Sequence, residues 1–249
     1  MAAGTRVGCA GWALDRSVQP RFPSAGSHLE RFAAVFGCVE INSSFYRPHK
    51  PQTYRRWAAS VPEGFRFSAK VPKEITHVRR LRGFDEPLDR FLSEVVLLGD
   101  KLGPLLIQLP PSSRFDAEVA GPFLEAFRSR FGGALALEPR HPTWFAPAPE
   151  NLLRDLRIAR VAADPALVPD AARPGGWQGL VYCRLHGSPE MYRSDYSQDR
   201  LEAYAKALAT EARRAETWCI FDNTALGHAI PNALSLMARL AARTTDPEP

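Results

Sequence analysis

The chain has 249 residues, of which 45% are hydrophobic and 24% charged, and its formal net charge is +5 at pH 7. These values suit one large folded domain and exclude a mainly disordered chain. No apolar run approaches the roughly 18 residues of a membrane-spanning helix, so we expect no membrane partner.

Short apolar runs alternate with amphipathic stretches along the chain, a pattern typical of α/β proteins. In chain order, the first half is predicted to contain strand 6–10, helix 27–36, strand 38–42, helix 51–60, strand 65–70, helix 86–102, strand 104–109 and helix 117–131. The second half is predicted to contain strand 134–138, helix 150–156, strand 158–163, strand 180–186, helix 199–214, strand 217–222 and helix 228–243. Residues 165–179 are rich in proline and glycine, so we expect an irregular loop in place of a helix after the sixth strand.

Eight strands with intervening helices can either close into a barrel or form an open, doubly wound sheet. No G-x-G-x-x-G follows the first strand, where a dinucleotide-binding sheet would carry it, and polar residues recur where the strands end. We therefore predict a TIM-like (β/α)8 barrel that forms a single domain over residues 1–243, followed by a frayed tail at 244–249.

The alternation of side chains along the predicted strands places polar groups on one face and apolar groups on the other. If Glu138 points inward, Leu135 and Leu137 face the helices. The same period puts Arg184 and His186 together on the inner face of their strand. We therefore expect a polar cluster near the barrel axis.

The four cysteines lie in or beside apolar, strand-like runs, and none forms a C-x-x-C pair. We interpret them as buried, reduced thiols, which predicts a cytoplasmic location and no metal cluster. The first six residues have no basic segment followed by an apolar one, so we expect no signal peptide.

Charged side chains gather at the predicted ends of the strands, where a barrel builds its site. The carboxylates Glu40 and Glu138 and the cations Lys70, Arg140 and Arg184 would leave positive charge over after pairing. This surplus suits a carboxylate or phosphate, which an arginine binds through two parallel hydrogen bonds. The predicted catalytic residues are Glu40, Lys70, Glu138 and His186.

Other polar residues at the strand ends, together with aromatic residues in the loops that follow, are predicted to contact the substrate. The rings would stack against a sugar or a base. The loop that contains Tyr192 and Tyr196 is a candidate lid. The predicted substrate contacts are Trp12, Asn42, Tyr46, His77, Gln108, Arg140, Trp144, Arg184, Tyr192, Tyr196, Asp222 and Asn223.

Each of these residues also has a purely structural interpretation. Glu40 could form a bridge with Lys70 from the neighbouring strand, and His186 could be a core histidine with satisfied hydrogen bonds. His77 could simply hold its loop in place, and the aromatic rings could cap the barrel as a small separate core. The sequence leaves these alternatives open.

Several short motifs occur in a characteristic order along the chain: GCAGW at 8–12, EINSSFYRP at 40–48, FRFSAK at 65–70, QLPP at 108–111, EPRH at 138–141, YCRLHG at 182–187 and FDNT at 221–224. Together they resemble the YecE-like family, domain of unknown function 72. The resemblance implies a TIM-barrel-like fold and supplies no function, because the family is similar to sugar-isomerase and endonuclease barrels only in fold. Two positions depart from the family pattern: Pro139 replaces an aromatic or apolar residue, and Asp222 replaces the more usual asparagine.

We expect an enzyme that acts on a small anionic substrate, phosphorylated or carboxylated, as a hydrolase, lyase or isomerase. A non-catalytic binder of an anionic metabolite would use the same pocket. Nucleic acid is a possible partner for an endonuclease-like enzyme, because the chain is basic, although its Lys and Arg residues are scattered. A glycoside hydrolase would use Glu40 and Glu138.

We expect no metal, because few histidines lie near strand ends, and no cofactor. The chain has no phosphate-binding P-loop, G-x-S-x-G elbow or H-E-x-x-H motif, which disfavours the chemistries that depend on them. The sequence does not predict the oligomeric state.

Overall fold

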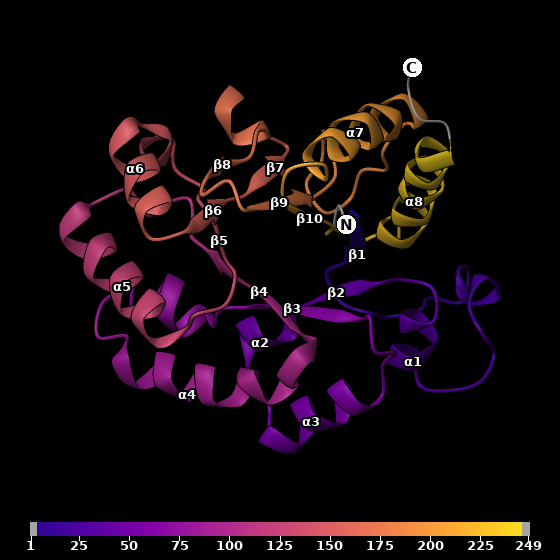
Figure 1. The fold of residues 1–249 in the computed structure, drawn as a ribbon, viewed down its shortest axis with the longest axis horizontal. Coiled ribbons are helices and arrows are strands. Elements are labelled where there is room, and N and C mark those ends of the chain that lie inside the picture. The colour runs from indigo at the N-terminus through magenta and orange to yellow at the C-terminus, as the bar shows by residue number, and fades with distance from the viewer. Residues whose placement is uncertain (1–3, 246–249) are drawn as a thin grey trace.

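Parallel strands form the centre of the molecule, and helices surround them (Figure 1). The computed structural model describes residues 4–245. All eight predicted strand regions form strands, which confirms an α/β fold with parallel sheets. The strands are β1 (Arg6–Cys9), β2 (Cys38–Ile41), β3 (Arg66–Lys70), β4 (Leu102–Gln108), β5 (Leu135–Glu138), β6 (Ile158–Arg160), β7 (Ala162–Asp164), β8 (Gly175–Gly176), β9 (Leu180–Leu185) and β10 (Glu216–Phe221).

Hydrogen bonding divides these strands into two sheets. One sheet has the order β1-β10-β9-β7, and the other has the order β2-β3-β4-β5-β6-β8. Within residues 4–245, every strand pairing is parallel except that of β6 with β8. The predicted sixth strand is split at Val161, because β6 pairs with β5 whereas β7 pairs with β9.

Two backbone links join the sheets. At the first, the amide of Gly11 donates to the carbonyl of Glu40 at 2.9 Å, beside an isolated parallel bridge between Ala10 and Glu40. At the second, the chain passes directly from β6 through Val161 into β7 of the other sheet, and the amide of Val161 donates to the carbonyl of Leu137 in β5. The hydrogen-bonded ladders themselves remain two, so closure of the strands into a barrel stays a prediction.

The seven predicted helices are all present, and an additional short helix, α2, directly follows β2. Ser27 begins α1 with a capping box: its side chain accepts from the amide of Glu30, whose carboxylate accepts from the amide of Ser27. No helix within the described residues is both long and apolar enough to cross a membrane. The helices are α1 (His28–Ala33), α2 (Ser43–Tyr46), α3 (Pro51–Ala59), α4 (Asp85–Val95), α5 (Ala117–Arg130), α6 (Pro147–Asp155), α7 (Gln198–Glu211) and α8 (Ala229–Thr245), and the short helical turns are η1 (Gln19–Arg21), η2 (Glu74–Val78), η3 (Val96–Lys101), η4 (Pro142–Phe145) and η5 (Pro169–Ala172).

Some boundaries differ from the sequence prediction. The predicted helix 86–102 is α-helical only to Val95 and continues as η3, in which Gly99 adopts a positive φ of 55° that interrupts the helix. The predicted loop 165–179 contains η5 and the two-residue strand β8, and no α-helix. Helix α8 extends through residue 245, so the first two residues of the predicted tail are helical, and residues 246–249 lie outside the described residues.

The side chains of the strands divide between two hydrophobic clusters. Leu135 and Leu137 belong to the larger cluster, which includes buried residues of the surrounding helices. Ala136 belongs to a smaller cluster that draws on both sheets and includes Tyr182. The predicted alternation in this strand is therefore confirmed, and its inner face continues into the polar end that carries Glu138.

We predict that Gly8→Ala lowers the free energy of unfolding by about 2 kcal/mol, because the added methyl group has no space. A Cβ at Gly8 would lie 2.3 Å from the carbonyl oxygen of Cys38, where β1 approaches β2. Gly37→Ala is the matched control, since a Cβ there meets no atom within 4 Å. Urea denaturation measures both variants, and equal stabilities would contradict the close approach of the two sheets.

Candidate functional site

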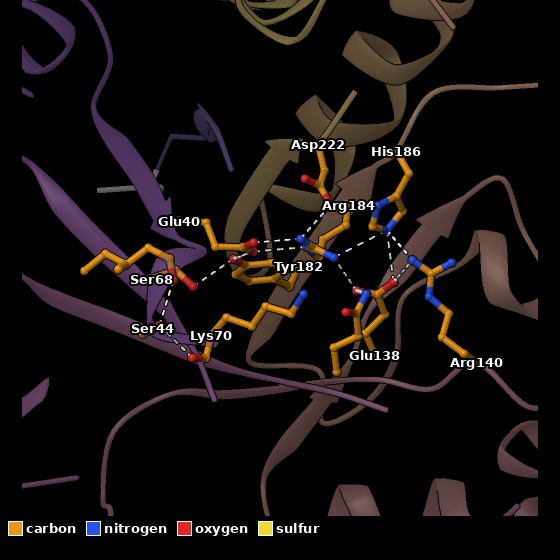
Figure 2. A network of polar contacts seen from close by, with 12 residues as sticks. Glu40, Ser44, Ser68, Lys70, Glu138, Arg140, Tyr182, Arg184, His186 and Asp222 are labelled. Carbon is orange, nitrogen blue, oxygen red and sulfur yellow. Dashed lines mark hydrogen bonds and ion pairs between the residues drawn. The ribbon is translucent and has the colours of Figure 1, made fainter. Parts of the chain in front are cut away.

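A fully buried arginine joins three carboxylates from separate strands. Arg184, in β9, lies 2.7 Å from Glu40 in β2, 2.7 Å from Glu138 in β5, and 2.9 Å from Asp222, the residue after β10. Its Nε also donates to Glu40 Oε2 at 3.0 Å, so Glu40 is held through both oxygens. Figure 2 shows the guanidinium of Arg184 between these side chains. The structure therefore brings four of the predicted site residues together.

The carboxylates around Arg184 are saturated with donors. Glu138 Oε2 also accepts from Gln108 at 3.1 Å, and Glu138 Oε1 is paired with Arg140. Burial opposes the ionisation of Glu138, but Arg140 and Arg184 overcome it and hold its pKa well below the ordinary value. Burial likewise opposes the ionisation of Asp222, and Arg184 nevertheless lowers its pKa. Glu138 and Asp222 therefore stay charged and hold cations in place.

Tyr182 and Ser68 are members of this network that the sequence analysis missed. The hydroxyl of Tyr182 lies 2.9 Å from Glu40 Oε2 and 2.8 Å from the hydroxyl of Ser68. Burial raises the pKa of Tyr182 well above its ordinary value, so its hydroxyl remains a donor. The two-residue period that placed Arg184 inward also places Tyr182 inward, so the signal was available.

His186 connects two of the carboxylates on the side of the network away from Glu40 (Figure 2). Its Nδ1 lies 3.0 Å from Asp222 Oδ2, while its Nε2 lies 3.0 Å from Glu138 Oε1 and 2.7 Å from Arg140 Nη2. An N–H at Nδ1 can donate to Asp222, while Nε2 either donates to Glu138 when it is protonated or accepts from Arg140 when it is not. The edge of the Tyr192 ring packs against the imidazole, with ring centroids 5.7 Å apart.

Lys70, at the end of β3, differs from every other cation in the cluster. It is 5% exposed, and its amine makes no hydrogen bond or ion pair with any residue of the range 4–245. The amine lies 4.0 Å from the centre of the Phe45 ring instead. Burial, reinforced by Arg184, lowers the pKa of Lys70 to about 8. The alternative of a structural bridge between Glu40 and Lys70 is therefore wrong.

Two further polar groups, which follow β2 and β5, lack strong partners. Asn42 directly follows β2 and begins α2, whereas Lys70 is the last residue of the neighbouring strand β3. The Oδ1 atom of Asn42 is buried and has no hydrogen-bond partner among the described residues. Arg140 Nη1 has only a 3.9 Å contact with the sulfur of Met191. We call the amine of Lys70, Asn42 Oδ1 and Arg140 Nη1 the open polar groups.

The predicted surplus of positive charge is absent. Asp222 pairs with Arg184, so three carboxylates face three cations, the third cation being Lys70. The surplus was predicted from Glu40 and Glu138 alone, and Asp222, which also follows a strand, supplies the third carboxylate. No group of three or more His, Cys, Asp or Glu side chains in the described part of the chain is arranged to hold a metal ion.

Two of the three predicted aromatic contacts Trp12, Trp144 and Tyr196 are buried. Trp12 is partly buried: it packs against the larger hydrophobic cluster and also lines a cavity with Gly11 and Thr224. Trp144 is 1% exposed and its indole donates to the carbonyl of Ser113. Tyr196 is also 1% exposed, and its hydroxyl accepts from the amide of Gly187. These rings pack in or against the larger cluster, whereas the structural interpretation placed them in a small separate core.

The remaining predicted contacts lie around the network. Tyr46 is 71% exposed. The ring of His77 packs edge-on against Phe45 at 4.9 Å, and burial together with Lys70 lowers the pKa of His77. The side-chain amide of Asn223 donates to Asn232 at 2.8 Å, which ties the loop after β10 to α8. Of these residues, His77 is connected to Lys70 through Phe45, whose ring contacts both side chains.

Comparison with known proteins places the chain among relatives of unknown function. It matches the family model described as "Protein of unknown function DUF72" over residues 6–249. It is 32% identical over 168 residues to UPF0759 protein YecE of Escherichia coli K12, covering 65% of this chain and 61% of that protein. It is 25% identical over 267 residues to UPF0759 protein YunF of Bacillus subtilis 168, covering 94% of each.

Solved structures of the same family have the same fold. A DUF72 family protein from Enterococcus faecalis V583 matches with a TM-score of 0.81 at 21% identity, covering 95% of each chain. A DUF72 family protein from Thermotoga maritima MSB8 matches with a TM-score of 0.79 at 25% identity, covering 96% of this chain and 99% of that one. The resemblance to the YecE-like family is confirmed. The descriptions of these relatives give no activity.

We predict that Arg184→Met destabilises the protein by about 3–5 kcal/mol, because it leaves three buried carboxylates without their shared cation. Chemical denaturation at neutral pH measures the change. Arg193→Met is the control, since its pair with Glu190 is exposed on both sides and should contribute less than about 1 kcal/mol. Similar losses in the two variants would show that the buried network does not hold the strands.

Lys70→Met is predicted to stabilise the protein at pH 7 by about 2 kcal/mol, because folding holds a charged amine where burial disfavours it. The pKa of Lys70 falls from 10.5 to about 8 on folding, so wild-type stability rises with pH between these values. The advantage of the variant should therefore shrink from pH 8 to pH 10.5. Denaturation midpoints across this range measure it, and a destabilised variant would mean that Lys70 acts as an ion-pair partner.

Proposed function

Since the chain belongs to the DUF72 family of proteins of unknown function, we propose its function from the site itself: an enzyme that acts on a small anionic substrate. The observation that carries this proposal is the amine of Lys70, which is almost buried at a strand end and has no carboxylate partner. A buried cation is normally paired or bound to a ligand.

We also propose that the two sheets close into a TIM-like (β/α)8 barrel, as one domain. Support comes from the backbone links at Glu40 and Val161 and from the small hydrophobic cluster to which both sheets contribute. In such a barrel, active sites lie at the C-terminal ends of the strands. Lys70 ends β3 and Asn42 directly follows β2, so both would lie at that mouth.

The open polar groups fit a carboxylate or phosphate that carries a nearby hydroxyl. Lys70 and Arg140 would donate charge-assisted hydrogen bonds to the anion, and Arg184 would keep its three carboxylates. The unpartnered Oδ1 of Asn42 would accept a hydrogen bond from the hydroxyl. Such a ligand would satisfy groups that are otherwise left without partners.

Chemistry fits this lysine better than binding alone. A receptor for anions needs only the charged lysine, whereas burial lowers the pKa of Lys70 to about 8, so part of the amine is neutral near pH 7 and can act as a base. The alternatives have less support. A glycoside hydrolase needs two available carboxylates, but Arg184 engages both Glu40 and Glu138. The endonuclease-like alternative has less support because Trp144 and Tyr196, two of the rings proposed to stack against bases, are buried.

We predict that inorganic phosphate, pyruvate or dihydroxyacetone phosphate raises the Tm of the wild-type protein, because these anions bind the folded state at the open polar groups. Lys70→Met and Arg140→Met should each weaken binding about tenfold or more, which is the loss of one charge-assisted hydrogen bond. Lys73→Met is the matched control, as Lys73 is an exposed lysine that follows β3 on the same segment.

Thermal shift as a function of anion concentration gives the apparent affinity for each variant. An anion that stabilises the wild type and Lys73→Met, but not the two site variants, would support the proposal. The absence of stabilisation by all three anions, or the same shift in Lys70→Met, would overturn it.

A further inference from the structure

We propose that the amine of Lys70 forms an imine with a carbonyl carbon of the substrate, which makes the substrate class an anionic aldehyde or ketone, such as an oxo acid or a sugar phosphate. This inference rests on the proposed function and assigns a covalent step to the same site. It follows from the position of the amine: almost buried, free of ion pairs and against an apolar ring.

Position 70 holds a lysine in a chain whose basic residues are mostly arginines. Only five of the 32 Lys and Arg residues of the chain are lysines: Lys50, Lys70, Lys73, Lys101 and Lys206. Lys70 is the one that is buried. Arg140 and Arg184 supply the charge that holds the carboxylates, and a guanidinium cannot act as a nucleophile at physiological pH because it stays protonated.

Arg184 keeps the amine of Lys70 available. Glu40, Glu138 and Asp222 would each favour the ammonium form of Lys70, and Arg184 binds all three. Figure 2 shows Lys70 extending toward Arg184 and Glu138, with no dashed line from its amine. With a pKa of about 8, roughly a tenth of the amine is uncharged at pH 7, which is the form that attacks a carbonyl.

The step balances without a cofactor. The nitrogen lone pair attacks the carbonyl carbon, the C=O pair moves to oxygen, and one N–H proton passes to that oxygen to give a carbinolamine. The nitrogen lone pair then forms the C=N bond and expels hydroxide, which takes the second N–H proton and leaves as water. Arg140 would hold the anionic group during these steps, and Asn42 would orient a neighbouring hydroxyl.

Reductive trapping tests the imine directly. The full chain is incubated with cyanoborohydride and pyruvate, dihydroxyacetone phosphate or neutral dihydroxyacetone, and the product is examined by intact mass and peptide mapping. We expect an adduct on Lys70 with the mass of the probe less one oxygen atom, formed at least tenfold faster than on the other lysines and faster with the anionic probes. Lys73→Met should label like the wild type.

The variants separate chemistry from folding. Lys70→Arg keeps the positive charge and Lys70→Met removes it, and both should lose the adduct while remaining folded by thermal denaturation. Absence of a Lys70 adduct with every probe, or equal labelling of Lys70 and the exposed lysines, would overturn the imine. If an anion still raised the Tm, the proposed function would stand. Equal trapping of dihydroxyacetone and its phosphate would support the imine and contradict the preference for anions.

Discussion

The pairing of one buried guanidinium with three carboxylates is the constraint on which the rest of this site depends. Arg184 has lost all contact with solvent, and such a loss is stabilising only when every charge and donor finds a partner. Its partners come from β2, β5 and the end of β10, in both sheets. The network therefore fixes the carboxyl ends of strands that do not all hydrogen-bond to one another.

The same pairing determines the state of Lys70. A lysine among several carboxylates would ordinarily form an ion pair with one of them. It would then stay protonated and would contribute only to stability. Arg184 makes better geometry with planar carboxylates, because its fork matches two oxygens at once, as it does at Glu40. Lys70 is left against Phe45, where burial favours the neutral amine. The arginine network and the free amine are thus two consequences of one arrangement.

Strand positions and side-chain direction could be predicted from the sequence, because both depend on local apolar patterns with a period of two. This is why Glu138, Arg184 and His186 meet as expected, and why Tyr182 could have been added. The partner in each ion pair could not be predicted. Whether Glu40 pairs with Lys70 or with Arg184 depends on distances between side chains at the ends of the strands. Trp144 shows a second limit, since an aromatic ring after a strand has the same sequence pattern whether it lines a pocket or fills the core.

A buried salt-bridge network is weak support for function when taken alone, because structural networks also gather charges and shift pKa values. A purely structural network, however, satisfies its members, and the saturated carboxylates of Glu40 and Glu138 follow that rule. Asn42 does not, because its buried Oδ1 has no hydrogen-bond partner among the described residues, and the amine of Lys70 has no ion-pair partner in the same part of the chain. A ligand that supplies these missing partners is the explanation we propose for both groups.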